Sequence, residues 1–171
     1  MHPFPRFALE AKRIPYLPDW TPPDGDTEYT WLEVPLEING VVEVGLVLHV
    51  GCWRYRPNCN VSFEIRVSKR PGRDCIPLAR VDWRSLNGGH SNQPRHGTEW
   101  AGMRLGDTHN HAFVLNWMPD QGRMKRSNLP VAMPINEHLE TFEALRAFFG
   151  KETRISNIEV VPPPQWEYKL L

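Results

Sequence analysis

Two histidines that lie two positions apart are the residues of this sequence with the clearest chemical potential. His109 and His111 open a stretch in which apolar residues alternate with others, and this alternation predicts a β-strand over residues 109–117. Side chains two positions apart on a strand project from the same face of a sheet. We therefore expect both imidazoles to point at one location, in line with the apolar side chains that follow them.

A second predicted strand brings charged residues toward this pair. The alternation over residues 76–83 places Arg80 and Asp82 on the same face as Ile76 and Leu78, so that charge enters a hydrophobic face. An arginine can stabilise an anionic group, and a carboxylate can orient a neighbouring imidazole. Arg80 and Asp82 are therefore candidate partners of the two histidines.

Two polar loops supply the other candidate residues. The segment 84–108 is rich in Gly, Ser, Asn and Pro, and a loop of that length is commonly functional. It carries His90, a third candidate catalytic or metal-binding histidine. Basic residues gather in a second loop, 120–128, after the histidine strand. The candidate substrate-binding residues of the two loops are Asn92, His96, Arg123, Lys125 and Arg126.

The histidines permit catalysis without a metal ion. Histidine titrates near neutral pH, so His109 and His111 can hold opposite protonation states and act as general base and general acid on a phosphodiester. Arg80 would then stabilise the anionic transition state, and Asp82 or His90 would orient the imidazoles. This arrangement needs no cofactor and is typical of a metal-independent ribonuclease.

The same histidines could instead bind a metal ion. Two neutral imidazoles at positions 109 and 111 of a strand can both reach one zinc or manganese ion. Such an ion needs at least one more ligand. That ligand would come from His90, His96, Asp82 or Asp107.

A structural role is the third interpretation of these residues. Arg80 would pair with Asp82 or a nearby carboxylate, and the histidines would hydrogen-bond to loop carbonyls at the rim of the core. The basic residues of the second loop would then simply be solvated. These three interpretations make different demands on the tertiary structure.

The elements that must hold these residues are mostly β-strands. Alternating residues over 31–38 and 42–50 flank Asn39-Gly40, a strong signal for a two-residue hairpin turn. Pro35 cannot donate a hydrogen bond to a strand ladder, so we expect the first strand at a sheet edge. A third alternating segment, 61–67, continues the sheet.

One helix is expected after the strands. Asn136 can cap its start, Gly150 can end it, and an apolar stripe between them has helical spacing. A last strand is expected over 155–161. A meander of strands followed by one helix predicts an α+β fold, with a mainly antiparallel sheet and the C-terminal helix packed on it in two layers.

The length of the chain suits one domain. Its 171 residues are enough for a single hydrophobic core. Prolines crowd residues 1–28, which we expect to form an extended arm. A single α+β domain is expected over 29–162, followed by a short tail over 163–171.

Composition limits the classes of function. Lysine plus arginine and aspartate plus glutamate number 20 each, so no overall charge attracts the chain to nucleic acid, and any polyanion contact must be local. No stretch approaches the ~20 apolar residues of a membrane span, and no signal peptide is apparent, which favours a cytoplasmic protein with no membrane partner. Three cysteines suit the reduced thiols of that compartment.

The order of the polar residues resembles a group of small bacterial and phage proteins related to the TumE-type toxin components of toxin-antitoxin pairs. The resemblance covers residues 60–162, including the helix and an Asn157-Ile158 segment. It implies an intracellular role in a toxin-antitoxin, prophage or anti-phage setting, with an antitoxin or defence component as protein partner. It implies no particular reaction. The matching positions are Arg80, Asp82, His90, His109 and His111.

We therefore expect a toxin-like hydrolase, with a metal-independent ribonuclease as the first hypothesis. His109 and His111 would form the acid-base pair, Arg80 would clamp the anion, and RNA is a possible substrate. The alternative from another class is a non-enzymatic binding module, such as an antitoxin, a phage inhibitor of host defence or a regulator, with structural histidines. A metal-binding hydrolase is the second alternative.

Overall fold

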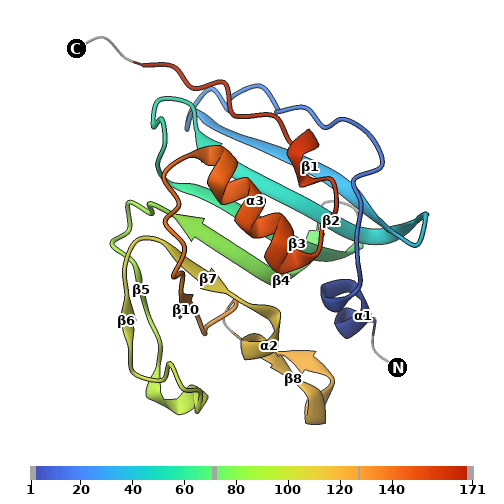
Figure 1. The fold of residues 1–171 in the computed structure, drawn as a ribbon, viewed down its shortest axis with the longest axis vertical. Helices are drawn as coiled ribbons and strands as arrows, with labels where there is room; N and C mark the ends of the chain where they lie inside the picture. Colours follow the sequence, from blue (N-terminus) through green and yellow to red (C-terminus); the bar gives the residue numbers. More distant parts are fainter. Residues whose placement is uncertain (1–2, 71–72, 127, 169–171) are drawn as a thin grey trace.

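An open antiparallel sheet of six strands forms the centre of the molecule, in a computed structural model that describes residues 3–70, 73–126 and 128–168. The strand order is β1-β2-β3-β4-β7-β10, and the first four strands follow one another as a meander (Figure 1). The strands of this sheet are β1 (Tyr29–Ile38), β2 (Val41–Trp53), β3 (Val61–Arg70), β4 (Arg73–Trp83), β7 (His109–His111) and β10 (Met133–Pro134).

Shorter elements flank the sheet. Two small hairpins, β5-β6 and β8-β9, extend from it beside β7 and β10. No helix of the described residues is long and apolar enough to cross a membrane. The remaining elements are α1 (Phe4–Leu9), β5 (His90–Ser91), η1 (Pro94–His96), β6 (Arg104–Leu105), α2 (Phe113–Asn116), β8 (Trp117–Met118), η2 (Pro119–Gln121), β9 (Arg123–Met124), α3 (Phe142–Thr153) and η3 (Ile158–Val160).

The predicted fold class is confirmed. The helix α3 lies across one face of the sheet (Figure 1), where Phe63 of β3 contacts Phe142 and Phe149 at ring-centroid distances of 5.6 and 5.3 Å. Burying these rings is worth on the order of 2 kcal/mol each. The chain is therefore an α+β protein of two layers, and its core lies between the sheet and α3.

The first hairpin forms where the sequence predicts it. Asn39 and Gly40 join β1 to β2 with positive φ values of 52° and 78°, as a two-residue hairpin turn requires. Pro35 lies in β1, which is an edge strand. Both predictions are confirmed, because turn chemistry and the missing proline donor act locally.

The predicted face of β4 is wrong because the strand contains a bulge. Ala79 pairs with Ile65 and Pro77 pairs with Arg66, which leaves Leu78 without a partner on β3. The extra residue shifts the alternation, so that Leu78 is buried in the core with Val81 and Trp83. Arg80 and Asp82 thus face away from α3, on the second side of the sheet.

The predicted strand 109–117 is also wrong beyond its first residues. Strand β7 ends at His111, and the chain then turns through the short helix α2. This turn buries both Phe113 and Asn116, whose spacing of three fits a helix and not a strand. The apolar residues after His111 therefore do not line the histidine face.

The boundaries of two other elements differ from the predictions. Thr141 caps α3 by accepting a hydrogen bond from the Ala144 N–H, and the helix continues through Gly150 to Thr153. Gly150 lies inside the helix and does not end it; glycine is needed there because a Cβ would come within 2.4 Å of Ile158. The expected strand 155–161 is replaced by one bridge from Ile155 to Lys12 and by η3.

The N-terminal segment is not extended throughout. Phe4 and Phe7 are buried on one side of the short helix α1, and this spacing of three is helical. Beyond it, Asn157 fastens the segment by accepting a hydrogen bond from the Ile14 N–H at 2.8 Å and donating one to the Ile14 carbonyl at 2.9 Å. Residues 3–28 therefore pack on the domain, partly as a helix.

Candidate functional site

The candidate site lies on the face of the sheet opposite α3, where β4 pairs with β7. Arg80 is in register with His111, and Asp82 is in register with His109. The two imidazole rings have centroids 5.0 Å apart. Strand alternation thus brings the histidine pair together as predicted, and it brings Arg80 and Asp82 to the same place.

His90 completes a cluster of three imidazoles. It is the first residue of β5, and its ring centroid lies 5.5 Å from that of His109 and 4.8 Å from that of His111. One nitrogen of each of the three rings lies within 4.8 Å of the others. The loop 84–108, which contains the β5-β6 hairpin, therefore folds its first histidine back onto β7.

Each of the three rings uses one nitrogen to reach a backbone carbonyl. A carbonyl oxygen only accepts hydrogen bonds, so that nitrogen carries the proton. In a neutral ring, the other nitrogen then presents a lone pair. The contacts are His109 Nδ1 to Gly106 O at 2.9 Å, His111 Nδ1 to Leu129 O at 2.7 Å and His90 Nε2 to Pro130 O at 3.0 Å.

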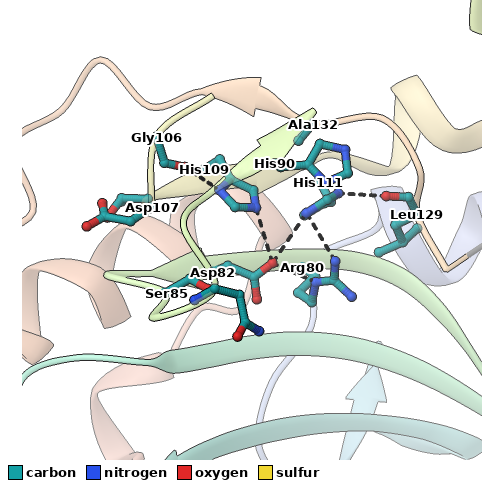
Figure 2. Close-up of polar contacts among 12 residues, drawn as sticks. Arg80, Asp82, Ser85, His90, Gly106, Asp107, His109, His111, Leu129 and Ala132 are labelled. Carbon is teal, nitrogen blue, oxygen red and sulfur yellow. Dashed lines mark hydrogen bonds and ion pairs between the residues drawn. The ribbon is translucent and has the colours of Figure 1, made fainter. Parts of the chain in front are cut away.

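Asp82 lies beside the free nitrogens of two rings (Figure 2). Its Oδ2 atom is 3.4 Å from Nε2 of His109 and 3.3 Å from Nε2 of His111. Burial opposes ionisation of this carboxyl, but its contacts with both histidines and the charge of Arg80 outweigh burial and hold the pKa of Asp82 well below its usual range. Asp82 is therefore an anion at neutral pH.

Arg80 spans the carboxylate and one histidine (Figure 2). Its Nε donates to Asp82 Oδ2 at 2.9 Å, and its Nη2 lies 3.1 Å from His111 Nε2. Because a guanidinium only donates, His111 Nε2 must be the acceptor. Burial lowers the pKa of His111 to about 4 despite the neighbouring Asp82, which agrees with a neutral ring.

Two buried asparagines hold the chain segment that supplies the carbonyls. Asn116 donates to Val131 O at 2.8 Å and accepts from the Val131 N–H at 3.0 Å. Asn92 makes the equivalent pair with Ala132, at 2.8 Å in both directions. Residues 129–132 are thus fixed from two sides. Sequence reasoning missed Asn116, although a polar residue that ends an apolar helical turn is a signal for such a role.

The turn before this segment is strained. Asn128 and Leu129 have φ values of 54° and 58°, a left-handed conformation that costs about 1–3 kcal/mol for a residue such as leucine. The Leu129 carbonyl that follows reaches His111 Nδ1 at 2.7 Å. A strained backbone that aims a carbonyl at a buried histidine is typical of a functional site.

A polar pocket of about 320 Å³ opens above the cluster. Arg80, Asp82, His90 and His109 line it, whereas His111 is fully buried beneath it with 0% exposure. Sequence reasoning missed the other polar lining residues, because only the register of separate strands and turns brings them here. They are Tyr29, Asn60, Ser62, Ser85 and Asn87.

The predicted substrate-binding residues separate into two groups. Asn92 is buried and its amide is used by the backbone of Trp100 and Ala132, so it does not line the pocket. Asp107, a possible metal ligand in the sequence, contacts Thr108 and is exposed. The other four predicted substrate-binding residues lie together in a second pocket of about 420 Å³, which Arg95 and Met118 also line. These four are His96, Arg123, Lys125 and Arg126.

Comparison with protein-family models, with curated proteins and with solved structures found no match for this chain. Function must therefore be argued from the site. Three imidazoles, a carboxylate and a guanidinium around a polar pocket can bind a metal ion, exchange protons or hold an anion.

Proposed function

We propose that this protein is a metal-dependent hydrolase that binds one divalent transition-metal ion through His90, His109 and His111. Zinc is the ion that we propose first. The observation that carries the proposal is the convergence of three imidazoles whose second nitrogens are bound to backbone carbonyls. Metal-binding histidines almost always donate their second N–H in this way, because that contact fixes the ring and exposes the lone pair. The neutral state of His111 agrees with such a role.

Asp82 supplies a negative charge, which imidazole ligands lack. Zinc–nitrogen bonds of about 2.0–2.1 Å place neighbouring ligand atoms of a tetrahedral ion about 3.3 Å apart. The Asp82 Oδ2 atom lies at this spacing from Nε2 of His109 and of His111, at 3.4 and 3.3 Å. An ion held by the histidines would therefore meet Asp82 as a fourth, anionic ligand.

Arg80 would change partners when an ion binds. Its Nη2 contacts His111 Nε2, so this contact must break to free the lone pair. The Nε contact with Asp82 can stay, and Glu64 lies 3.9 Å from Arg80 Nη1 as a second anionic partner. Arg80 would then remain at the pocket wall, where a guanidinium can stabilise an anionic oxygen of the substrate.

The metal ion supplies Lewis acidity when bound, which polarises a water molecule or an ester oxygen. A metal-free acid-base pair of His109 and His111 is less well supported, because His111 is fully buried and both of its nitrogens are engaged. The histidines that reach the pocket are His90 and His109. The resemblance to TumE-type toxins is our reason to place the activity in a cytoplasmic toxin-antitoxin or anti-phage setting, with a protein partner.

Metal content tests the proposal. Untagged protein purified without chelators should carry about one equivalent of zinc or a related ion by mass spectrometry, and cobalt substitution should give the visible bands of a low-symmetry nitrogen-oxygen site. His90→Ala should lose the ion and remain folded, because His90 is only half-buried. The matched control is His138→Ala, whose side chain is 86% exposed and pairs with Glu140.

Two results would overturn the metal proposal. One is wild-type protein that lacks metal and binds zinc no better than His90→Ala. The other is hydrolysis of RNA that is undiminished by a chelator and abolished by His90→Ala, which would restore the metal-independent ribonuclease.

A further inference from the structure

A second pocket, apart from the one above the histidine cluster, concentrates positive charge. It lies between η1 and the β8-β9 hairpin, and no acidic side chain of the described residues lines it. The chain as a whole has no net charge, so this concentration is local. The residues that line it are Arg95, His96, Met118, Arg123, Lys125 and Arg126.

The cations of this pocket have no anionic partners in the described part of the chain. No carboxylate there lies within 4.0 Å of the charged groups of Arg95, Arg123, Lys125 or Arg126. Several positive side chains elsewhere do have anionic partners: Arg6 pairs with Glu43, Arg54 with Glu167 and Lys151 with Glu137. Unpaired cations that are held close together favour an anionic ligand, because they repel one another without it.

One polar atom of a pocket-lining residue also lacks a partner within the described ranges. The Nε2 atom of His96 is buried and has no hydrogen-bond partner among the described residues. Lys125 Nζ reaches the His96 carbonyl at 3.4 Å, which ties the second loop to η1. Burial and the positive charges of Lys125 and Arg95 lower the pKa of His96, and burial lowers that of Lys125.

The basic pocket and the histidine cluster are close along the chain. Strand β5 starts with His90 in the cluster, and His96, six residues later, lines the basic pocket. Six residues span at most about 20 Å. An extended ligand with several negative charges could therefore contact both places.

We infer that the substrate is a single-stranded nucleic acid whose phosphate backbone occupies the basic pocket while one phosphodiester reaches the histidine cluster. Only the second part of this inference, that a phosphodiester reaches the histidine cluster, rests on the proposed hydrolase function. A single strand fits better than a duplex, because His109 lies in a recess with 3% exposure and a flexible backbone can enter where a rigid helix cannot. Arg80 at the pocket wall would contact the phosphate that is cleaved.

Binding of a labelled single-stranded RNA 12-mer tests the inference by fluorescence anisotropy, in a chelator so that no metal-dependent cleavage occurs. Arg95→Gln/Arg126→Gln removes two exposed charges that line the pocket. We expect at least a ten-fold loss of affinity and a decrease of about 1.4 in the slope of log affinity against log salt. Arg13→Gln/Arg56→Gln is the matched control, because it removes two exposed charges outside the pocket and should change affinity less than three-fold.

Further ligands define what would overturn the inference. Single-stranded DNA of the same sequence shows whether the sugar matters, and either sugar agrees with the proposal. Tighter binding to duplex RNA, to phosphatidylserine vesicles or to a poly-glutamate peptide would overturn it, as would unchanged RNA binding by Arg95→Gln/Arg126→Gln. Because the assay contains no metal, the two proposals fail separately. RNA binding by a protein that lacks metal and binds zinc no better than His90→Ala would refute the hydrolase proposal alone, and metal binding without RNA binding would refute this inference alone.

Discussion

Asp82 joins three other residues of the site, because one carboxylate oxygen meets His109, His111 and Arg80. Its Oδ2 atom accepts from Arg80 Nε at 2.9 Å and lies beside both imidazoles. It comes from a strand that is in register with β7, so its position depends on backbone pairing and not on a flexible loop. Substitution at this residue therefore tests the site without disturbing the core.

We predict that Asp82→Asn lowers zinc affinity by about 10- to 100-fold while the protein stays folded. The amide keeps the shape of the carboxylate but removes the charge that would balance the ion. Competition with a chromophoric chelator measures the affinity, and circular dichroism checks the fold. Asp107→Asn is the matched control, since the Asp107 side chain is exposed near the site and accepts a hydrogen bond from the neighbouring Thr108; equal affinities for both variants would contradict the role of Asp82.

Lys12 is a second residue with an unusual environment, far from the site in sequence. Its ammonium is buried and donates to the carbonyls of Ala8 and Glu10 at 3.1 and 2.6 Å. Burial and the charge of Arg154 lower the pKa of Lys12 to about 8, although Glu10 opposes them. The folded protein therefore binds the Lys12 proton less strongly than the unfolded chain does.

We predict that Lys12 makes the protein more stable as the pH rises. Between pH 8 and the ordinary lysine pKa of 10.5, the unfolded chain holds this proton and the folded protein does not, so the free energy of unfolding increases with pH. The increase is at most about 3 kcal/mol and should be absent in Lys12→Met. Urea unfolding at pH 8 and pH 10 measures it. Lys151→Met, which removes an exposed lysine, should keep the wild-type increase; a parallel loss there would contradict the assignment.

At the scale of elements, the site depends on a short segment that forms neither a helix nor a strand. Residues 129–132 present carbonyls to His111 and His90, and the side chains of Asn116 and Asn92 hold them in place. The short helix α2 turns the Asn116 side chain inward, where it hydrogen-bonds to the backbone of Val131. The geometry of the histidine cluster is therefore set by packing between α2, β5 and this segment.

We predict that Asn116→Ala destabilises the protein by about 2–4 kcal/mol, because it leaves the Val131 N–H and C=O buried without partners. Zinc affinity should fall as well, since the Leu129 carbonyl would no longer be fixed against His111. Chemical unfolding and zinc titration measure the two effects. Asn136→Ala is the control at an exposed asparagine, and a stability loss of the same size there would contradict a specific role for Asn116.

At the scale of the whole molecule, one face of the sheet packs the core and the other holds the candidate site. The face under α3 holds the hydrophobic core, and the opposite face holds Arg80, Asp82 and the histidine cluster beneath loops. Arg80 and Asp82 come from β4 of the meander, whereas His90 and the carbonyls of Leu129 and Pro130 come from segments outside it. Binding of an ion should therefore stabilise the loops more than the meander.

We predict that zinc at about 100 times its dissociation constant raises stability by about 2.7 kcal/mol, or Tm by roughly 5–10 °C. Hydrogen exchange should slow over residues 85–111 and 128–132 and stay unchanged in the β1-β2 turn. Differential scanning calorimetry and mass spectrometry measure these effects. Magnesium is the control ion, and His90→Ala should show no zinc response; slowing spread evenly over the chain would contradict a local site.

Several features could be predicted because they depend on neighbours in sequence. The turn at Asn39-Gly40 follows from residues that tolerate positive φ, and the edge position of β1 follows from a missing proline donor. The shared direction of His109 and His111 follows from the two-residue period of a strand. These are local consequences of backbone geometry, so the alternation of the sequence was sufficient.

Other features were decided by tertiary structure, because they join residues that are far apart in the chain. The bulge at Leu78 turns Arg80 and Asp82 away from the core, and only pairing with β3 shows that extra residue. The carbonyl of Leu129 fixes the proton of His111 across 18 positions of sequence. The sequence alone thus determined which side chains were chemically capable, whereas long-range packing decided that they meet, which nitrogens stay free and which histidine is buried out of reach of a substrate.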